Sequence, residues 1–229
     1  MKTFSIAIHG GAGTLVKGMM TAELENKYKE ALKEALDAGY SVLESGGNSV
    51  KAVEKAVIVL EDSNLFNAGK GAVFTANETH EMDASIMNGK SLNAGAVSLI
   101  SGIKNPISLA CDVMEKSEHV FLAGEGAMQF AKVNNYSIED PSYFYDDFRH
   151  KQWLEIKDTD SFQLDHSKKK DSKFGTVGAV ACDLNGNIAA ATSTGGMTNK
   201  RFGRVGDSPM IGAGNYANNK TCAISCTGS

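Results

Sequence analysis

Apolar side chains recur at helical spacing in the first quarter of the chain. Between residues 21 and 45 they return every three or four positions, which predicts one amphipathic helix. Thr21 can cap the first turn of this helix, and Gly46-Gly47 can end it. Asn48 or Ser49 then caps a second helix that has a single apolar face. Both helices are therefore expected to pack one side against a core.

Short apolar runs without helical spacing predict a set of strands. The runs are residues 4–8, 84–87, 94–100, 119–122, 176–184, 187–192 and 221–226. Asn88-Gly89 and Asn185-Gly186 each separate two such runs, and Asn-Gly pairs favour two-residue hairpin turns. Further helices are expected at 106–116, where Pro106 suits the first turn, and at 124–132.

The character of the sequence changes between residues 135 and 175. This stretch holds acidic pairs, aromatic residues and the run Lys168-Lys169-Lys170. Such a composition predicts a solvated linker with a short helix near residues 143–153. Three lysines in an otherwise neutral setting are typical of a solvated face rather than of nucleic-acid binding.

Composition and charge narrow the class of protein. A chain of 229 residues forms one large domain or two small ones. Its net charge of -4 indicates neither a nucleic-acid footprint nor a membrane-binding patch. The apolar run after Met1-Lys2-Thr3 is too short for a signal peptide, and no long apolar stretch follows. We therefore expect a soluble cytoplasmic protein without nucleic-acid or membrane partners.

The cysteines and histidines suggest no metal site. The cysteines match no zinc-binding spacing and are few for a disulfide scaffold, so we interpret them as reduced, buried thiols. They are Cys111, Cys182, Cys222 and Cys226. The five histidines form no recognisable catalytic triad, and we interpret each as structural or surface.

Two glycine-rich stretches have open interpretations. His9-Gly10-Gly11-Ala12-Gly13 follows a strand, but it lacks the spacing and the Lys-Ser/Thr ending of a phosphate loop. We expect a close turn in which backbone approaches backbone or a ligand. Residues 61–71 are either a plain connector or a loop that turns carbonyl groups toward a hard cation.

The dipeptide Gly175-Thr176 separates the linker from the last group of strands. Thr176 is either a β-branched residue that opens a strand or a nucleophile created by cutting the chain after Gly175. In the second case, its new α-amine would have a pKa of about 7.7–8.0 and could take the hydroxyl proton without any histidine.

Seven motifs, taken in order, identify a family. They are His9-Gly10-Gly11-Ala12-Gly13, Leu65-Phe66-Asn67-Ala68-Gly69, Gly175-Thr176-Val177-Gly178-Ala179-Val180, Thr192-Ser193-Thr194-Gly195-Gly196-Met197, Gly203-Arg204-Val205-Gly206-Asp207-Ser208-Pro209, Gly212-Ala213-Gly214 and Cys226-Thr227-Gly228. Together they resemble the plant-type L-asparaginase / isoaspartyl peptidase (beta-aspartyl-peptidase) family of N-terminal nucleophile hydrolases. The resemblance runs from about residue 5 to residue 229 and thins only in the linker.

This resemblance implies an α+β fold, the four-layer αββα sandwich, made as an inactive precursor. The precursor would cut itself between Gly175 and Thr176. Residues 1–175, including the linker 135–175, would form the α subunit, and residues 176–229 an apparently incomplete β subunit of the same domain.

The resemblance also implies roles for individual residues. Thr176 would be the nucleophile, Thr194 the threonine that polarises it, and Asn67 a neighbour that lines the site. Arg204 and Asp207 would hold the α-carboxylate and the α-ammonium of the substrate. A planar guanidinium suits a carboxylate, and an acid lies three residues away. Thr227 and Gly228 would donate to the oxyanion.

Cofactors and partners follow from the same resemblance. No organic cofactor is expected. Main-chain carbonyls of the loop before the first strand pair would hold a sodium ion, namely those of Leu60, Glu61, Ser63, Phe66, Ala68 and Lys70. The substrates would be asparagine and β-aspartyl dipeptides, and the assembly a homodimer of αβ pairs.

Two alternatives differ in function. Glycosylasparaginases tend to carry an acidic residue before the threonine and a secretory signal, whereas Gly175 stands here without such a signal. Family members continue beyond the position of Ser229, so a truncated, inactive member with a structural or regulatory role is the other alternative. On that basis we expect an isolated chain ending at Ser229 to be poorly stable or inactive, because sheet edges would be unpaired.

Overall fold

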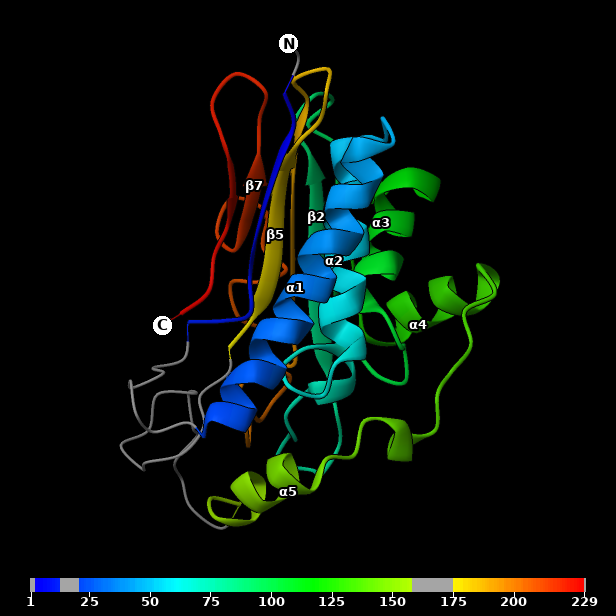
Figure 1. Cartoon of the computed structure of the whole chain (residues 1–229). Coiled ribbons are helices and arrows are strands. Elements are labelled where there is room, and N and C mark those ends of the chain that lie inside the picture. The colour runs from blue at the N-terminus through cyan, green and yellow to red at the C-terminus, as the bar shows by residue number, and fades with distance from the viewer. Residues whose placement is uncertain (1–2, 13–20, 158–174, 229) are drawn as a thin grey trace.

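A six-stranded sheet organises the computed structural model, which describes residues 3–12, 21–157 and 175–228 (Figure 1). The strand order is β1-β5-β6-β2-β3-β4, with β3 and β4 parallel and the other pairs antiparallel. The strands are β1 (Ser5–His9), β2 (Met82–Asn88), β3 (Ala94–Ile100), β4 (Phe121–Ala123), β5 (Val177–Cys182) and β6 (Ile188–Thr194). The N-terminal strand β1 therefore lies at one edge beside β5, and β6 pairs with β2 at the centre of the sheet.

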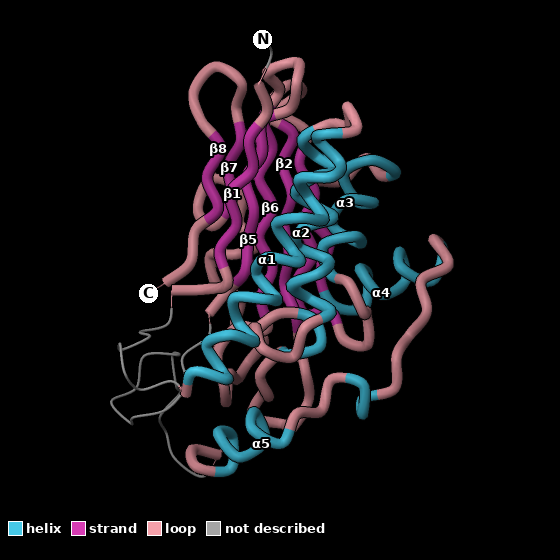
Figure 2. The backbone as a smooth tube through the Cα atoms, viewed as in Figure 1, coloured by secondary structure: helices cyan, strands magenta, loops and turns pink. Residues whose placement is uncertain are grey.

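Helices cover one face of this sheet, as Figures 1 and 2 show. They are α1 (Ala22–Glu44), α2 (Ser49–Asp62), α3 (Pro106–Lys116) and α4 (Gly124–Val133). Helix α5 (Asp147–Leu154) lies beyond one end of the sheet, and two short 3-10 turns are η1 (Gly69–Gly71) and η2 (Pro141–Tyr143). The predicted caps are confirmed, because Thr21 accepts a hydrogen bond from the Leu24 amide and Asn48 accepts one from the Lys51 amide.

A second, two-stranded sheet lies on the opposite face (Figure 2). It consists of β7 (Asn215–Ala217) and β8 (Ala223–Ser225), which contact β5, β6 and β2. The described residues thus form a mixed α+β fold with a helical layer, a central sheet and a small outer sheet. Among them, no helix is both long and apolar enough to cross a bilayer.

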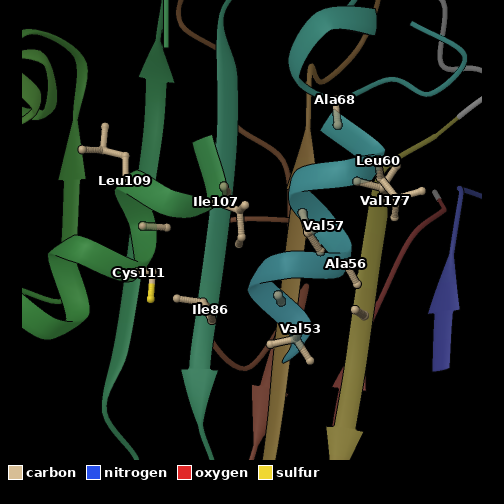
Figure 3. Close-up of a cluster of buried hydrophobic side chains, with 14 of the residues drawn as sticks. Val53, Ala56, Val57, Leu60, Ala68, Ile86, Ile107, Leu109, Cys111 and Val177 are labelled. Atoms are coloured by element: carbon tan, nitrogen blue, oxygen red, sulfur yellow. The ribbon is translucent and has the colours of Figure 1, made fainter. Parts of the chain in front are cut away.

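The helical face of the central sheet is the apolar core (Figure 3). Ile86 of β2 and Val177 of β5 point toward α2, where Val53, Val57 and Leu60 are fully buried. Small strand residues allow the helices to approach closely: a Cβ atom on Gly95 of β3 would lie 2.0 Å from the Ala110 carbonyl oxygen of α3.

Both predicted hairpins form, with the return strand of the first at Ala94 as expected, but the second is longer than the two-residue turn predicted. After β2, residues 89–93 form the loop, and the amide of Asn88 bonds the Asn93 carbonyl. After β5, the Asp183 amide bonds the Asn187 carbonyl, and Gly186 has a φ of 77°. This is a three-residue loop closed by a left-handed glycine. The Asp183 carboxylate accepts bonds from the Asn185 and Asn187 amides, which stabilises the longer turn.

Other sequence predictions need smaller corrections. The strand expected at 119–122 begins two residues later, at Phe121, and the linker helix is α5. The prediction of a solvated linker is wrong for the described part of that stretch, where Phe144, Arg149 and Trp153 are buried. Only Cys111 is buried among the four free thiols; Cys222 is exposed. The run Lys168-Lys169-Lys170 lies outside the described residues.

Candidate active site

Strand register brings the two predicted site threonines together. Val177 pairs with Ser193 across β5 and β6, so Thr176, one residue earlier, faces the position of Thr194. Thr194 in turn pairs with Asp83 of β2. Side chains alternate along a strand, and Ser193 points to the helices, where it bonds Glu61 of α2. Thr176, Thr194 and Asp83 therefore share the face that looks toward β7 and β8.

The hydroxyl of Thr176 contacts a residue that the sequence analysis did not single out. Its Oγ1 lies 3.1 Å from Oγ of Ser208, which is buried. The Ser208 carbonyl accepts a 2.6 Å hydrogen bond from the Ser85 hydroxyl of β2, so the loop is tied to the sheet. In the sequence, Ser208 could have been linked to the site only through its position directly after the predicted clamp residue Asp207.

Asn67 shapes the turn that follows Thr194. Its side-chain Nδ2 donates to the Gly196 carbonyl at 2.7 Å, and its main-chain carbonyl accepts from the Gly195 amide at 3.0 Å. The Thr194 hydroxyl accepts from the Gly196 amide at 3.0 Å. A Cβ atom on Gly195 would lie 2.5 Å from Asn67 Oδ1, so this packing leaves no room for a side chain. The structure thus brings Asn67 and Thr194 into one hydrogen-bonded turn.

Arg204 and Asp207 lie in the exposed loop that leads to Ser208. The Arg204 guanidinium lies over Gly206, with Nη1 3.0 Å from the position of a Cβ atom there. Within the described residues no ion pair joins Arg204 to Asp207. A guanidinium and a carboxylate that do not neutralise each other can receive the two charged ends of an amino acid.

Beneath this loop lies a buried pair of charges that was not predicted. Burial raises the pKa of Asp83, and the nearby Lys200 and Arg204 oppose that shift. Burial lowers the pKa of Lys200, whose Nζ donates to the Glu81 carbonyl at 2.7 Å. Asp83 Oδ2 has no hydrogen-bond partner among the described residues. The pair adds titratable groups next to Thr194.

Thr227 and Gly175 lie close together. Thr227 Oγ1 is 3.0 Å from the position of a Cβ atom on Gly175, and Gly228, with a φ of 125°, lies near Ala12. A Cβ atom on Gly11 would lie 2.5 Å from the Gly175 nitrogen. The predicted close backbone approach of the segment His9-Gly10-Gly11-Ala12-Gly13 is confirmed at Gly11, whereas Gly13 lies outside the described residues. The segment that Gly11 meets leads directly into Thr176 and β5.

The loop between α2 and η1 winds tightly. The carbonyls of Leu60, Phe66 and Ala68 accept bonds from the amides of Ser63, Ala68 and Gly71. Gly69, at a φ of 53°, presses against the Glu61 carbonyl, where a Cβ atom would lie 2.4 Å away. These carbonyls retain second lone pairs, which fits oxygen ligation of a hard cation. The Lys70 side chain extends away from its own carbonyl and places its ammonium over the Tyr143 ring.

The Glu61 side chain is fully buried in the helical face. Desolvation raises its pKa to about 8, although hydrogen bonds from Ser193 and the Ile107 amide act in the opposite direction. Those bonds measure 2.6 Å and 3.0 Å. The sequence analysis assigned Glu61 only a carbonyl role, because nothing in its spacing indicated a buried carboxyl.

A cavity of about 520 Å³ lies away from these residues, lined mainly by apolar and aromatic side chains such as Phe74, Phe144 and Tyr145. None of the predicted site residues lines it. We therefore place the candidate site at Thr176 and not in this cavity.

Sequence comparison with known proteins shows similarity along the whole chain. The sequence matches the asparaginase family over residues 1–229. It is 50% identical to the isoaspartyl peptidase of Escherichia coli strain K12, covering 97% of this chain and 70% of that protein. It is 47% identical to the isoaspartyl peptidase/L-asparaginase of Xenopus laevis, over 97% and 69% of the two chains. It is also 47% identical to the plant-type L-asparaginase of Pyrococcus furiosus, over 98% and 73%. The resemblance inferred from the motifs is confirmed, and the chain belongs to the asparaginase family.

Proposed function

We propose that this chain is an isoaspartyl peptidase and L-asparaginase that cuts itself at Gly175-Thr176 and then uses Thr176 as its nucleophile. The observation that carries the proposal is the convergence of Thr194, Ser208 and Thr227 around this dipeptide. The names of the relatives at 43–50% identity support the substrate class.

The first step would be the self-cleavage. The Thr176 hydroxyl attacks the Gly175 carbonyl carbon, the peptide C–N bond breaks, and an ester replaces it. Water then hydrolyses the ester, which leaves a carboxylate on Gly175 and a free α-amine on Thr176. Thr227, whose hydroxyl already lies against Gly175, would donate to the oxyanion.

The second step would repeat this chemistry on a substrate. Arg204 and Asp207 hold its α-carboxylate and α-ammonium, so that the side-chain amide faces Thr176. The α-amine of Thr176 takes the hydroxyl proton, and the hydroxyl oxygen attacks the amide carbon. Ammonia, or the amine of the following residue, leaves, and water releases aspartate from the acyl-enzyme. Thr194 and Asn67 would line and polarise the nucleophile.

The wider assembly completes the proposal. Residues 1–175 and 176–229 would become α and β subunits of one domain with the four-layer αββα arrangement. The described central sheet, its helical face and the outer β7–β8 sheet would supply part of those layers. A sodium ion in the loop between α2 and η1 and a dimer of αβ pairs belong to the same proposal, as does a cytoplasmic location.

Intact-mass spectrometry over hours of incubation tests the proposal. We expect wild type to split between Gly175 and Thr176, and Thr176→Ala to stay whole. Cleaved protein should release ammonia from asparagine and aspartate from β-aspartyl dipeptides. A wild-type chain that folds but neither splits nor turns over would favour the inactive alternative. Turnover restricted to glycosylated asparagine would favour a glycosylasparaginase.

A further inference from the structure

We propose that His9 and Ser225 are positioning residues that hold the Thr227-Gly228 segment against the Gly175–Thr176 bond. The inference rests on the proposed function, because it assigns two further residues a part in the same site. It begins from a hydrogen bond that joins the first strand to the last.

Gly178 leaves the space in which these residues meet. In the central sheet His9 pairs with Gly178, and Gly178 pairs with Thr192, so the three form one row across β1, β5 and β6. A Cβ atom on Gly178 would lie 1.9 Å from Ser225 Oγ and 2.6 Å from His9 Nε2. The Ser225 hydroxyl of β8 therefore fills the position that a side chain on Gly178 would occupy.

Two polar contacts anchor Ser225 there, and a third fixes one of its partners. Its Oγ lies 2.9 Å from His9 Nε2 and 2.6 Å from Thr192 Oγ1, and Thr192 also donates to the Gly214 carbonyl at 3.1 Å. Burial lowers the pKa of His9, with the neighbouring backbone of Thr176 acting in the opposite direction. The imidazole contacts Ser225 through Nε2, and its buried Nδ1 has no hydrogen-bond partner among the described residues.

Apolar packing does little to fix β8 at this point. Ile224, the central residue of β8, is 45% exposed. A cavity of about 270 Å³ separates part of β8 from β1 and β5, and His9 and Ser225 line it. The pairing of Ser225 with Asn215 of β7 and the bond from the Cys226 amide to the Gly214 carbonyl join this end of β8 to its neighbours, and the side-chain contacts of Ser225 add a direct link to β1 and β6.

The anchor lies two residues before Thr227, whose Oγ1 is 3.0 Å from the position that a Cβ atom on Gly175 would take. Loss of the anchor would let Thr227-Gly228 shift, and a displacement of about 1 Å can cost up to about 100-fold in rate. The Arg204–Asp207 clamp lies in a different loop, so substrate affinity should be preserved. A fall in kcat with an unchanged KM is the signature of the proposed role.

A matched set of variants tests this role. Ser225→Ala and Thr192→Val each remove one anchor hydroxyl, whereas Thr192→Ser keeps it. Ser117→Ala is the control, because it also removes a bonded hydroxyl, at the end of α3. We measure the cleavage rate by intact mass, kcat and KM for asparagine by ammonia release, and the imidazole ¹⁵N shifts of His9 by NMR.

Ser225→Ala and Thr192→Val should lower the cleavage rate and kcat by about 10-fold or more, with KM nearly constant. Thr192→Ser and Ser117→Ala should behave like wild type. The His9 ¹⁵N shifts should change only in the variants that lose the anchor. The double variant His9→Asn with Ser225→Ala should lose no more kcat than the worse of the two single variants, because both substitutions remove the same contact between His9 and Ser225.

The proposal is overturned if folded Ser225→Ala matches Ser117→Ala in cleavage rate and kcat, or if the His9 shifts do not change. It is also overturned if Thr192→Ser loses as much activity as Thr192→Val. A wild-type chain that never cleaves would overturn the proposed function instead, and the NMR comparison would still test whether Ser225 holds His9.

Discussion

The two faces of the central sheet are built from the same strands but have different chemistry. The face under α2 carries Ile86 and Val177, packed in an apolar core in which Glu61 is the buried acid. The face under β7 and β8 has a small apolar cluster at one end, where Met87 and Ala190 pack with Ala217. At its other end it carries hydroxyls and charges, including those of Ser85, Thr194 and Asp83. Adjacent residues of one strand thus serve stability on one side and the candidate chemistry on the other.

This difference teaches where changes should be felt. An apolar face stabilises the fold through area removed from water and through close packing. A buried polar face contributes little net stability per hydrogen bond, but it holds donors and acceptors in defined positions. Substitutions on the helical face should therefore change the free energy of unfolding, and those on the outer face should change rates.

The largest effect is expected from Ile86→Ala on the helical face. Removal of a fully buried isoleucine should lower the free energy of unfolding by about 2–5 kcal/mol, because a cavity remains. Urea titration measures this loss. The fraction that stays folded should still cleave at the wild-type rate. Slow cleavage by fully folded Ile86→Ala would break the distinction between the two faces.

Glu61 should give the helical face a pH dependence. Its pKa in the folded protein is about 8, against 4.5 for the unperturbed group. The folded state therefore holds a proton that the unfolded state has lost, and stability falls as pH rises from about 4.5 to 8. Glu61→Gln removes this titration. The difference in unfolding free energy between wild type and Glu61→Gln should drop by a few kcal/mol across that window. A constant difference would show that Glu61 is charged in the fold.

Arg204→Lys should act on the substrate and leave the fold intact. Lysine keeps the charge but loses the paired donors of the guanidinium, so kcat/KM for asparagine should fall by about 10-fold to 100-fold. The free energy of unfolding should be unchanged, because Arg204 is exposed. A lower kcat/KM for Arg204→Lys, at the same melting temperature as wild type, would support the role of Arg204 in binding the carboxylate. Unaltered kinetics would move carboxylate recognition to another residue.

Ser208→Ala should have the smallest effect, about 10-fold on the rate of self-cleavage. The variant removes the hydroxyl that contacts Thr176 but leaves the Ser208 carbonyl that Ser85 binds. Intact-mass time courses measure the rate. The matched variant Ser85→Ala removes that tie to the sheet, and it should slow cleavage less. Cleavage of Ser208→Ala at the wild-type rate would remove Ser208 from the site.

Much of the helical layer could be predicted from local pattern. The spacing of apolar residues, the caps Thr21 and Asn48, and Pro106 at the first turn of α3 act within one or two turns of chain. The loop after β5 was less predictable, because the Asp183 side chain competes with the two-residue turn that Asn185-Gly186 favours.

The sequence by itself determined the family, because its motifs can be recognised from their order along the chain without any contact being known. It also singled out Thr176. Only the tertiary structure decided what surrounds that threonine. Ser208 meets Thr176 across 32 residues, and His9 meets Ser225 across 216. Such contacts depend on strand register, since a shift by one residue would turn every side chain of a strand to the other face. No local pattern encodes that register, so the neighbours of Thr176 became visible only once the strands were paired.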